Sequence, residues 1–252
     1  MRPLAAAAIA LALALMGCGG EDGSASGGGG TLTVSAASSL KSAFTDYAEE
    51  FDGAAVRLSF AGSDELAAQI RKGIRPDVFA AANTRLPDAL YDEGLVRKPV
   101  VFAGNRLVIA VPADSGVDSV EDLAAGGTKL AIGSRSVPVG DYTRTVIGRL
   151  DARTRDAILG NVRSEEPDVN GVVGKVSQGA VDAGFVYVTD VAATDGKLRA
   201  IELPARLQPT VAYGAAVVKG GRNPQAARRF VDGLVTGDGA RTLGDAGFEQ
   251  PR

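Results

Sequence analysis

From residue 31 onward, stretches with the pattern of a buried strand alternate with stretches that have the apolar spacing of a helix. Strands are predicted at Thr31–Ala36, Val56–Phe60, Asp77–Ala82, Leu107–Val111, Lys129–Ile132, Val181–Val188 and Thr210–Val218. Helices are predicted at Leu40–Phe51, Ser63–Ile70, Arg85–Glu93, Val120–Ala125, Gly140–Leu150, Val169–Gln178 and Asn223–Val235. This alternation predicts an α/β fold, with a mainly parallel sheet covered by helices on both faces.

Four turns that follow predicted strands share a character that suits an anion. Each is made of small or polar residues, contains no Lys or Arg and opens a predicted helix: Ala37-Ser38-Ser39-Leu40, Ala61-Gly62-Ser63-Asp64, Val137-Pro138-Val139-Gly140 and Pro167-Asp168-Val169-Asn170. Such turns offer free backbone N–H groups at the positive end of a helix dipole, and two of them add hydroxyls. Because open α/β sheets bind ligands at the carboxyl ends of their strands, the turns together predict an anion site.

Each turn taken singly has a simpler explanation. Ser39, Ser63 and Asp168 are ordinary residues for capping a helix, and glycines such as Gly62 and Gly140 are common in turns. Tyr187, at the end of a predicted strand, is by itself best explained as a half-buried aromatic residue with a satisfied hydroxyl. Only the occurrence of all four turns in one chain favours a binding site.

The scarcity of histidine and cysteine excludes several kinds of catalytic and metal site. The sequence has no histidine and a single cysteine, Cys18, which removes the usual general base, the commonest metal ligand, disulfides and a cysteine nucleophile from the folded part. With 27 Lys and Arg against 30 Asp and Glu, the chain is mildly acidic, so nucleic acid is not expected as a partner.

The first thirty residues predict export and anchoring. Arg2, the apolar run Leu4–Met16 and the tetrapeptide Leu15-Met16-Gly17-Cys18 predict a lipoprotein signal peptide at 1–17, with a lipid attached to Cys18. The run is too short to span a bilayer of roughly 30 Å. Residues 18–30 are then the lipidated cysteine and a Gly/Ser-rich tether.

Seven short strings, in order across nearly the whole mature chain, match one known family. They are Val34-Ser35-Ala36-Ala37-Ser38-Ser39-Leu40, Ser59-Phe60-Ala61-Gly62-Ser63 followed by Leu66 and Gln69-Ile70, Pro76-Asp77-Val78-Phe79, Gly104-Asn105-Arg106-Leu107, Val137-Pro138-Val139-Gly140, Asp168-Val169, and Val186-Tyr187 with Asp190. In these strings the chain resembles the periplasmic molybdate-binding proteins of oxyanion import systems. Each string is weak alone, and their order makes the signal specific.

The resemblance implies a bilobed type II periplasmic-binding-protein fold, in which two α/β lobes joined by a two-stranded hinge close over the ligand. Residues 31–109 with 212–252 would form one lobe and 110–211 the other. The implied ligand is molybdate, and also tungstate, held as an oxyanion without a cofactor. The implied oxyanion-binding residues are Ser39, Ser63, Val139, Val169 and Tyr187.

The same resemblance implies the setting of the protein. A monomer on the extracytoplasmic face of the cell membrane, held by its lipid anchor, would deliver molybdate to the permease of an ABC importer with its ATPase, and would catalyse no reaction. A receptor for sulfate or phosphate is the nearest alternative. A surface enzyme or sensor on the same fold is a further one, although the four turns offer it no catalytic group apart from Asp64 and Asp168.

Three residues depart from the family pattern. Asp64 follows the second serine, where the family has a small uncharged residue, and is expected to face solvent from the first helical turn. If it faced inward, it could accept a proton from hydrogen phosphate and change the specificity. Ser35 and Ser38 stand where the family often has apolar residues or alanine, and the Ser38 hydroxyl is expected to face solvent.

Overall fold

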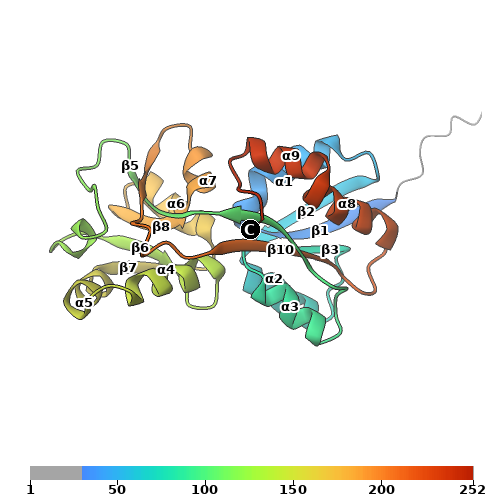
Figure 1. The fold of residues 1–252 in the computed structure, drawn as a ribbon, viewed down its shortest axis with the longest axis horizontal. Helices are drawn as coiled ribbons and strands as arrows, with labels where there is room; N and C mark the ends of the chain where they lie inside the picture. The colour runs from blue at the N-terminus through green and yellow to red at the C-terminus, as the bar shows by residue number, and fades with distance from the viewer. Residues whose placement is uncertain (1–29, 252) are drawn as a thin grey trace, which may run out of the picture.

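The computed structural model describes residues 30–251, which fold into two α/β lobes lying side by side (Figure 1). The signal peptide predicted at 1–17, Cys18 and all but the last residue of the predicted tether lie outside the described residues. No helix among residues 30–251 is both long and apolar enough to cross a membrane.

The first lobe is built on a five-stranded sheet in the order β2-β1-β3-β10-β4. Its strands are β1 (Thr31–Ala37), β2 (Ala55–Ala61), β3 (Val78–Ala81), β4 (Val100–Asn105) and β10 (Val211–Val217). Its helices are α1 (Lys41–Glu50), α2 (Ser63–Arg71), α3 (Arg85–Asp92), α8 (Pro224–Thr236) and α9 (Asp238–Asp245), with a 3₁₀ turn, η1 (Ser38–Leu40), leading into α1. Figure 1 shows α1, α8 and α9 over one face of this sheet and α2 and α3 over the other.

The second lobe has a sheet of the same size in the order β7-β6-β8-β5-β9. Its strands are β5 (Leu107–Pro112), β6 (Leu130–Gly133), β7 (Val162–Glu166), β8 (Ala183–Tyr187) and β9 (Leu198–Glu202). Its helices are α4 (Pro138–Gly148), α5 (Ala152–Gly160), α6 (Val169–Ser177) and α7 (Val188–Ala192), with a 3₁₀ turn, η2 (Asp122–Ala124). The helix predicted at Val120–Ala125 is thus only this short turn.

Both sheets are mixed, which corrects the prediction of a mainly parallel sheet. In the first sheet β1 runs parallel to β2 and β3, whereas β10 is antiparallel to β3 and β4. In the second, β6 runs parallel to β7 and β8, whereas β5 is antiparallel to β8 and β9. The antiparallel strands β4, β5, β9 and β10 are those that flank the crossings between the lobes, so the strand–helix pattern does not govern their direction.

The chain crosses between the lobes twice. It leaves the first sheet at Asn105, enters the second at Leu107, and returns between Glu202 and Val211. The two crossings are held together because the Gln208 side chain accepts a hydrogen bond from the Leu107 N–H (3.2 Å) and donates one to the Leu107 carbonyl (3.1 Å). The division of the lobes predicted at 109/110 and 211/212 stays a prediction, close to these crossings.

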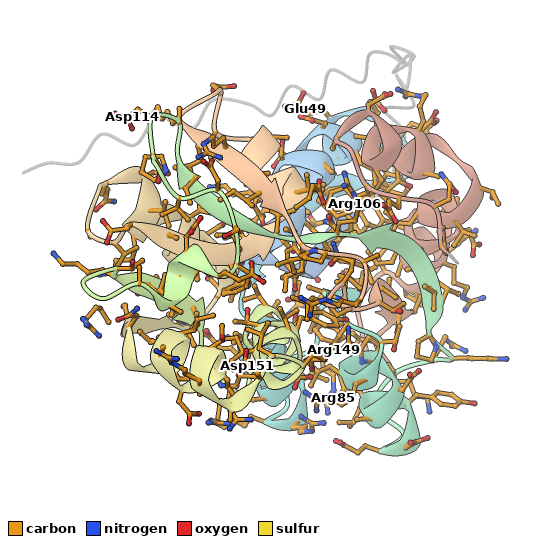
Figure 2. All side chains as sticks on the ribbon, turned by 60° about the vertical axis from the view of Figure 1, so that its left-hand side comes forward. Glu49, Arg85, Arg106, Asp114, Arg149 and Asp151 are labelled. Carbon is orange, nitrogen blue, oxygen red and sulfur yellow. The ribbon has the colours of Figure 1, made fainter. Side chains whose placement is uncertain are left out.

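Arg106 marks the first crossing, near the middle of the molecule in Figure 2. Its guanidinium lies 2.5 Å from a carboxylate oxygen of Glu202, which belongs to β9, and 3.2 Å from one of Glu249, near the C-terminus. The side chain therefore bridges an element of each lobe at the hinge.

Candidate oxyanion-binding site

The register of the strands brings the predicted turns together. Ala37 is the partner of Ala61 at the ends of the parallel strands β1 and β2, so the turns that carry Ser39 and Ser63 leave the first sheet side by side. In the second sheet Gly133 is the partner of Glu166, so the turns that lead into α4 and α6 also leave side by side. All four turns face the same gap between the lobes, and their helices begin there.

A small cavity lies where these turns meet. Its lining includes the five residues predicted to bind an oxyanion, and comprises Ala37, Ser38, Ser39, Ala61, Gly62, Ser63, Ala82, Val137, Pro138, Val139, Asp168, Val169 and Tyr187. Its volume is about 20 Å³, against roughly 300–1,000 Å³ for pockets that hold drug-sized molecules. The cavity therefore suits one small ion.

The lobes touch at the rim of this cavity, and Gly62 allows the contact. A Cβ atom on Gly62 would lie 2.5 Å from the carbonyl oxygen of Pro167 in the other lobe. Since Gly62 has an ordinary backbone conformation, with φ of −58°, it is the close approach that requires a glycine. The Asn170 amide adds a hydrogen bond of 3.4 Å from the second lobe to the Ser38 carbonyl.

The electrostatics of the lining favour an anion without any basic side chain. The first backbone N–H groups of α2, α4 and α6 have no acceptor within their own helices and carry the positive end of the helix dipole. Asp168 is the one acidic residue of the lining, and its Oδ1 accepts the Gly171 N–H at 3.0 Å as the cap of α6. Its charge is thus partly compensated by the helix.

The Ser63 hydroxyl is set to donate to a ligand. Ser63 is 1% exposed, and its Oγ accepts the Ala82 N–H at 3.1 Å. That contact uses a lone pair of the oxygen and leaves the hydroxyl hydrogen free for an acceptor in the cavity. The Ser39 Oγ lies 3.1 Å from the hydroxyl of Tyr213.

Tyr187 presents a second kind of donor. Its hydroxyl is buried and has no hydrogen-bond partner among residues 30–251. The pKa of Tyr187 lies well above its ordinary value, mainly because the side chain is buried and to a smaller extent because Tyr213 is close to it. The phenol therefore keeps its proton at neutral pH. A buried phenolic O–H without an acceptor costs free energy unless a ligand accepts it.

Asp64 and Ser38 differ from their predicted orientations. The Asp64 Oδ1 is buried and has no hydrogen-bond partner within the described residues, although the residue as a whole is only half-buried. The residue nevertheless does not line the small cavity. Ser38 is 6% exposed and does line it, so the expectation of a solvent-facing hydroxyl is wrong. Ser35 is also buried.

Asp190 orients the backbone of Tyr187. It is 7% exposed, and its Oδ2 accepts the Tyr187 N–H at 2.9 Å. Burial raises the pKa of Asp190 from 3.8 to about 7; the hydrogen bond from Tyr187 lowers it and the charge of Asp168 raises it. A group whose folded pKa is raised binds its proton more tightly in the folded than in the unfolded state.

Asp190 should therefore make stability depend on pH. Between about pH 4 and about pH 7 unfolding releases its proton, so we expect the free energy of unfolding to fall as pH rises through this window. Asp190→Asn retains an oxygen for the Tyr187 N–H but cannot ionise, and should flatten the slope in denaturant unfolding measured at several pH values. The control is Asp114→Asn, on an outer loop of the second lobe (Figure 2). An unchanged slope in Asp190→Asn would contradict this assignment.

Residues 30–251 contain no group of three or more His, Cys, Asp or Glu side chains placed to ligate a metal ion. A larger cavity, of about 580 Å³, opens beside the small one and shares Ser38 and Ser39 with it.

Sequence reasoning missed the residues behind the site. Tyr213 lies on a predicted strand and Asn105 in one of the matched strings, but neither pattern indicates that Tyr213 reaches Ser39 or that Asn105 reaches Tyr213. Their contacts join residues 174 and 108 positions apart along the chain. Such pairs follow from the path of the hinge strands, which a local sequence pattern does not reveal.

Comparison with known proteins agrees with this geometry. The family model of bacterial extracellular solute-binding proteins matches residues 32–249. The molybdate-binding protein ModA of Mycobacterium tuberculosis is 37% identical over 228 residues, which cover 88% of this chain and 85% of that protein. A Bacillus subtilis protein named as a candidate ABC transporter substrate-binding lipoprotein, YvgL, is 29% identical over 86% of both chains.

Among solved structures, the periplasmic molybdate-binding protein of Azotobacter vinelandii superposes with a TM-score of 0.79 at 22% identity, covering 88% of this chain and 100% of that one. The two-lobed type II periplasmic-binding-protein fold is thus that of this chain. Its family is one of solute-binding proteins and not of enzymes. The chain belongs to the bacterial extracellular solute-binding proteins, in the family of the molybdate-binding protein ModA.

Proposed function

We propose that this protein captures molybdate, and tungstate as well, and delivers it to an ABC importer. The observation that carries the proposal is a cavity small enough for one ion, lined by hydroxyl groups and helix N-termini and free of basic side chains. Molybdate is a tetrahedral dianion that can only accept hydrogen bonds. The names of the relatives, which bind molybdate or belong to ABC transport, support the same solute and the same partner.

The donors come from both lobes. Ser39 and Ser63 would donate their hydroxyl and backbone hydrogens from the first lobe. The backbone amides of Val139 and Val169 and the hydroxyl of Tyr187 would donate from the second. An ion held by both lobes favours the closed form over the open one, which an importer could then recognise.

A set of donors also discriminates between oxyanions. Hydrogen phosphate would bring an O–H that needs an acceptor, and an unmet buried polar group costs about 1–3 kcal/mol. Sulfate is a pure acceptor like molybdate, so it has to be rejected by size. Of the two carboxylates at this place, Asp168 lines the cavity and caps α6 through its Oδ1, whereas Asp64 does not line the cavity.

Calorimetric titration of residues 19–252 with molybdate, tungstate, sulfate and phosphate tests the proposal. Molybdate and tungstate should bind with similar affinity, sulfate should bind more weakly and phosphate weakest. Phosphate binding more tightly than molybdate would show a receptor for a different oxyanion. No heat with any of the four would contradict an oxyanion receptor altogether.

The place of action is part of the proposal. The signal peptide at 1–17, a lipid on Cys18 and the tether that follows would hold a monomer at the extracytoplasmic face of the cell membrane, close to its permease. The lipoprotein name of the Bacillus subtilis relative supports this. Cys18→Ala should release the protein from the membrane fraction while the purified domain keeps its affinity; retention of the variant in membranes would contradict the anchor.

A further inference from the structure

Tyr213 is a fully buried tyrosine of the hinge strand β10 whose hydroxyl touches the binding site from behind. The residue is 0% exposed. Within the described part of the chain its hydroxyl has two polar neighbours, the Ser39 Oγ at 3.1 Å and the Asn105 Nδ2 at 3.4 Å. Burial, and then the charge of Asp190, raises the pKa of Tyr213 well above its ordinary value, so the hydroxyl keeps its hydrogen.

The orientation of the Asn105 amide is fixed independently. Its Oδ1 accepts the N–H of Arg106 at 2.8 Å, which turns the NH₂ group toward Tyr213 and Thr189. That group donates to the Thr189 Oγ1 at 2.9 Å and to the Tyr213 hydroxyl. An amide NH₂ group can only donate, so the Tyr213 oxygen is the acceptor in this contact.

These contacts fix the direction of the hydrogen bond between Tyr213 and Ser39. If Ser39 donated to Tyr213, the Tyr213 oxygen would accept twice and its own buried hydrogen would have no acceptor, at a cost of about 1–3 kcal/mol. The satisfied arrangement has Tyr213 donating to the Ser39 Oγ. The hydrogen of Ser39 is then free for the cavity, as that of Ser63 is, because the Ala82 N–H occupies the Ser63 oxygen.

We propose that Tyr213 is a positioning residue which, through its hydroxyl, keeps Ser39 a hydrogen-bond donor toward the cavity and takes up one of the two lone pairs of that serine oxygen. The inference rests on the proposed function, since it concerns the same site. Tyr213 does not line the cavity: its hydroxyl reaches the lining through Ser39, while its ring, which Tyr213→Phe keeps, packs edge-on against Tyr187. The hydrogen bonds continue from Tyr213 through Asn105 to Thr189, on the first turn of α7 in the second lobe. Asn105 ends β4, before the first crossing, and Tyr213 lies on β10, after the second. Both crossings therefore contribute a residue that orients the Ser39 hydroxyl.

Two effects are expected from Tyr213→Phe. The affinity for molybdate should fall by about tenfold, because the Ser39 hydroxyl loses both its fixed direction and the polarisation that a donated hydrogen bond supplies. The affinity for phosphate should fall less, because the Ser39 hydroxyl, no longer held by Tyr213, can turn to accept the phosphate hydrogen. A purely structural loss would weaken both anions in parallel and leave their ratio unchanged.

The test is a double-mutant cycle measured by calorimetric titration with molybdate and phosphate. In the Ser39→Ala background, Tyr213→Phe should change the molybdate affinity by less than about twofold, since the group through which it acts is gone. Tyr47→Phe is the matched control: it removes another buried tyrosine hydroxyl, one that donates to the Phe230 carbonyl at 3.2 Å in the core of the first lobe. It should bind both anions as the wild type does.

Asn105→Ala tests the same positioning of Ser39 without changing Tyr213. It removes the donor that fixes the direction of the Tyr213 hydroxyl, and should cause a smaller loss of molybdate affinity that also disappears in the Ser39→Ala background. Wild-type binding by Tyr213→Phe, or an equal loss with and without Ser39, would overturn the inference. The proposed function is tested separately by the titrations of the wild type and of Ser39→Ala, because neither protein is changed at Tyr213.

Discussion

Simultaneous replacement of Ser39 and Ser63 by alanine is expected to abolish molybdate binding at concentrations that saturate the wild type. Each serine would contribute a hydroxyl hydrogen bond to a charged oxygen, worth about 1.5–3 kcal/mol. Loss of both corresponds to a fall in affinity on the order of 10²–10⁴-fold. Molybdate at 100 times its dissociation constant adds about 2.7 kcal/mol to the stability of the wild type, and this gain should vanish in a thermal melt.

Two exposed helical serines supply the matched control. Ser42, on α1 of the first lobe, and Ser177, at the end of α6 in the second, are both exposed, and neither lines the small cavity. The Ser42→Ala/Ser177→Ala protein should show the full molybdate shift. If the Ser39→Ala/Ser63→Ala protein kept that shift as well, the solute would bind elsewhere in the molecule.

Gly140→Ala is the second change with a large expected effect, on stability and binding together. A Cβ atom on Gly140 would lie 1.8 Å from the carbonyl oxygen of Ser134 and 2.4 Å from that of Gly133. Both are backbone atoms of the turn between β6 and α4, so they cannot give way as the end of a side chain could. The turn that presents the Val139 amide must move instead.

Such overpacking costs about 1–3 kcal/mol, and occasionally more. We expect a lower free energy of unfolding in denaturant and a weaker molybdate affinity in calorimetry. Gly148→Ala, at the other end of the same helix, is the control: its Cβ would meet nothing within 4 Å, and alanine should stabilise the helix by up to about 1 kcal/mol. Equal stability of the Gly140→Ala and Gly148→Ala proteins would contradict the close packing of this turn.

The elements that build the site could be predicted from sequence because each has a strong local signal. Ser39 and Ser63 follow strands with clear apolar patterns and precede helices with clear apolar faces, and the parallel register of β1 and β2 then brings them together. Val139, Val169 and Tyr187 came from the family resemblance, and the structure places them around the same cavity. Their roles as ligands to an oxyanion remain proposals.

Other elements had no such signal. β7, Val162–Glu166, is an edge strand made largely of polar and charged residues, so hydrophobic periodicity does not reveal it. The sequence pattern does not reveal β4, and it reveals β10 but not its antiparallel direction, which follows from the path of the hinge. The burial of the Asp64 Oδ1 is likewise not visible in the local pattern, which shows only a favourable place for a carboxylate in the first turn of α2.

The most direct test of the account is a crystal structure of the protein grown with molybdate, with an anomalous difference map calculated from molybdenum. We expect one strong peak in the small cavity, at a position from which the oxygens of molybdate reach the Ser39, Ser63 and Tyr187 hydroxyls within hydrogen-bonding distance. A peak only in the larger neighbouring cavity, or none between the lobes of a protein shown to bind molybdate in solution, would contradict it.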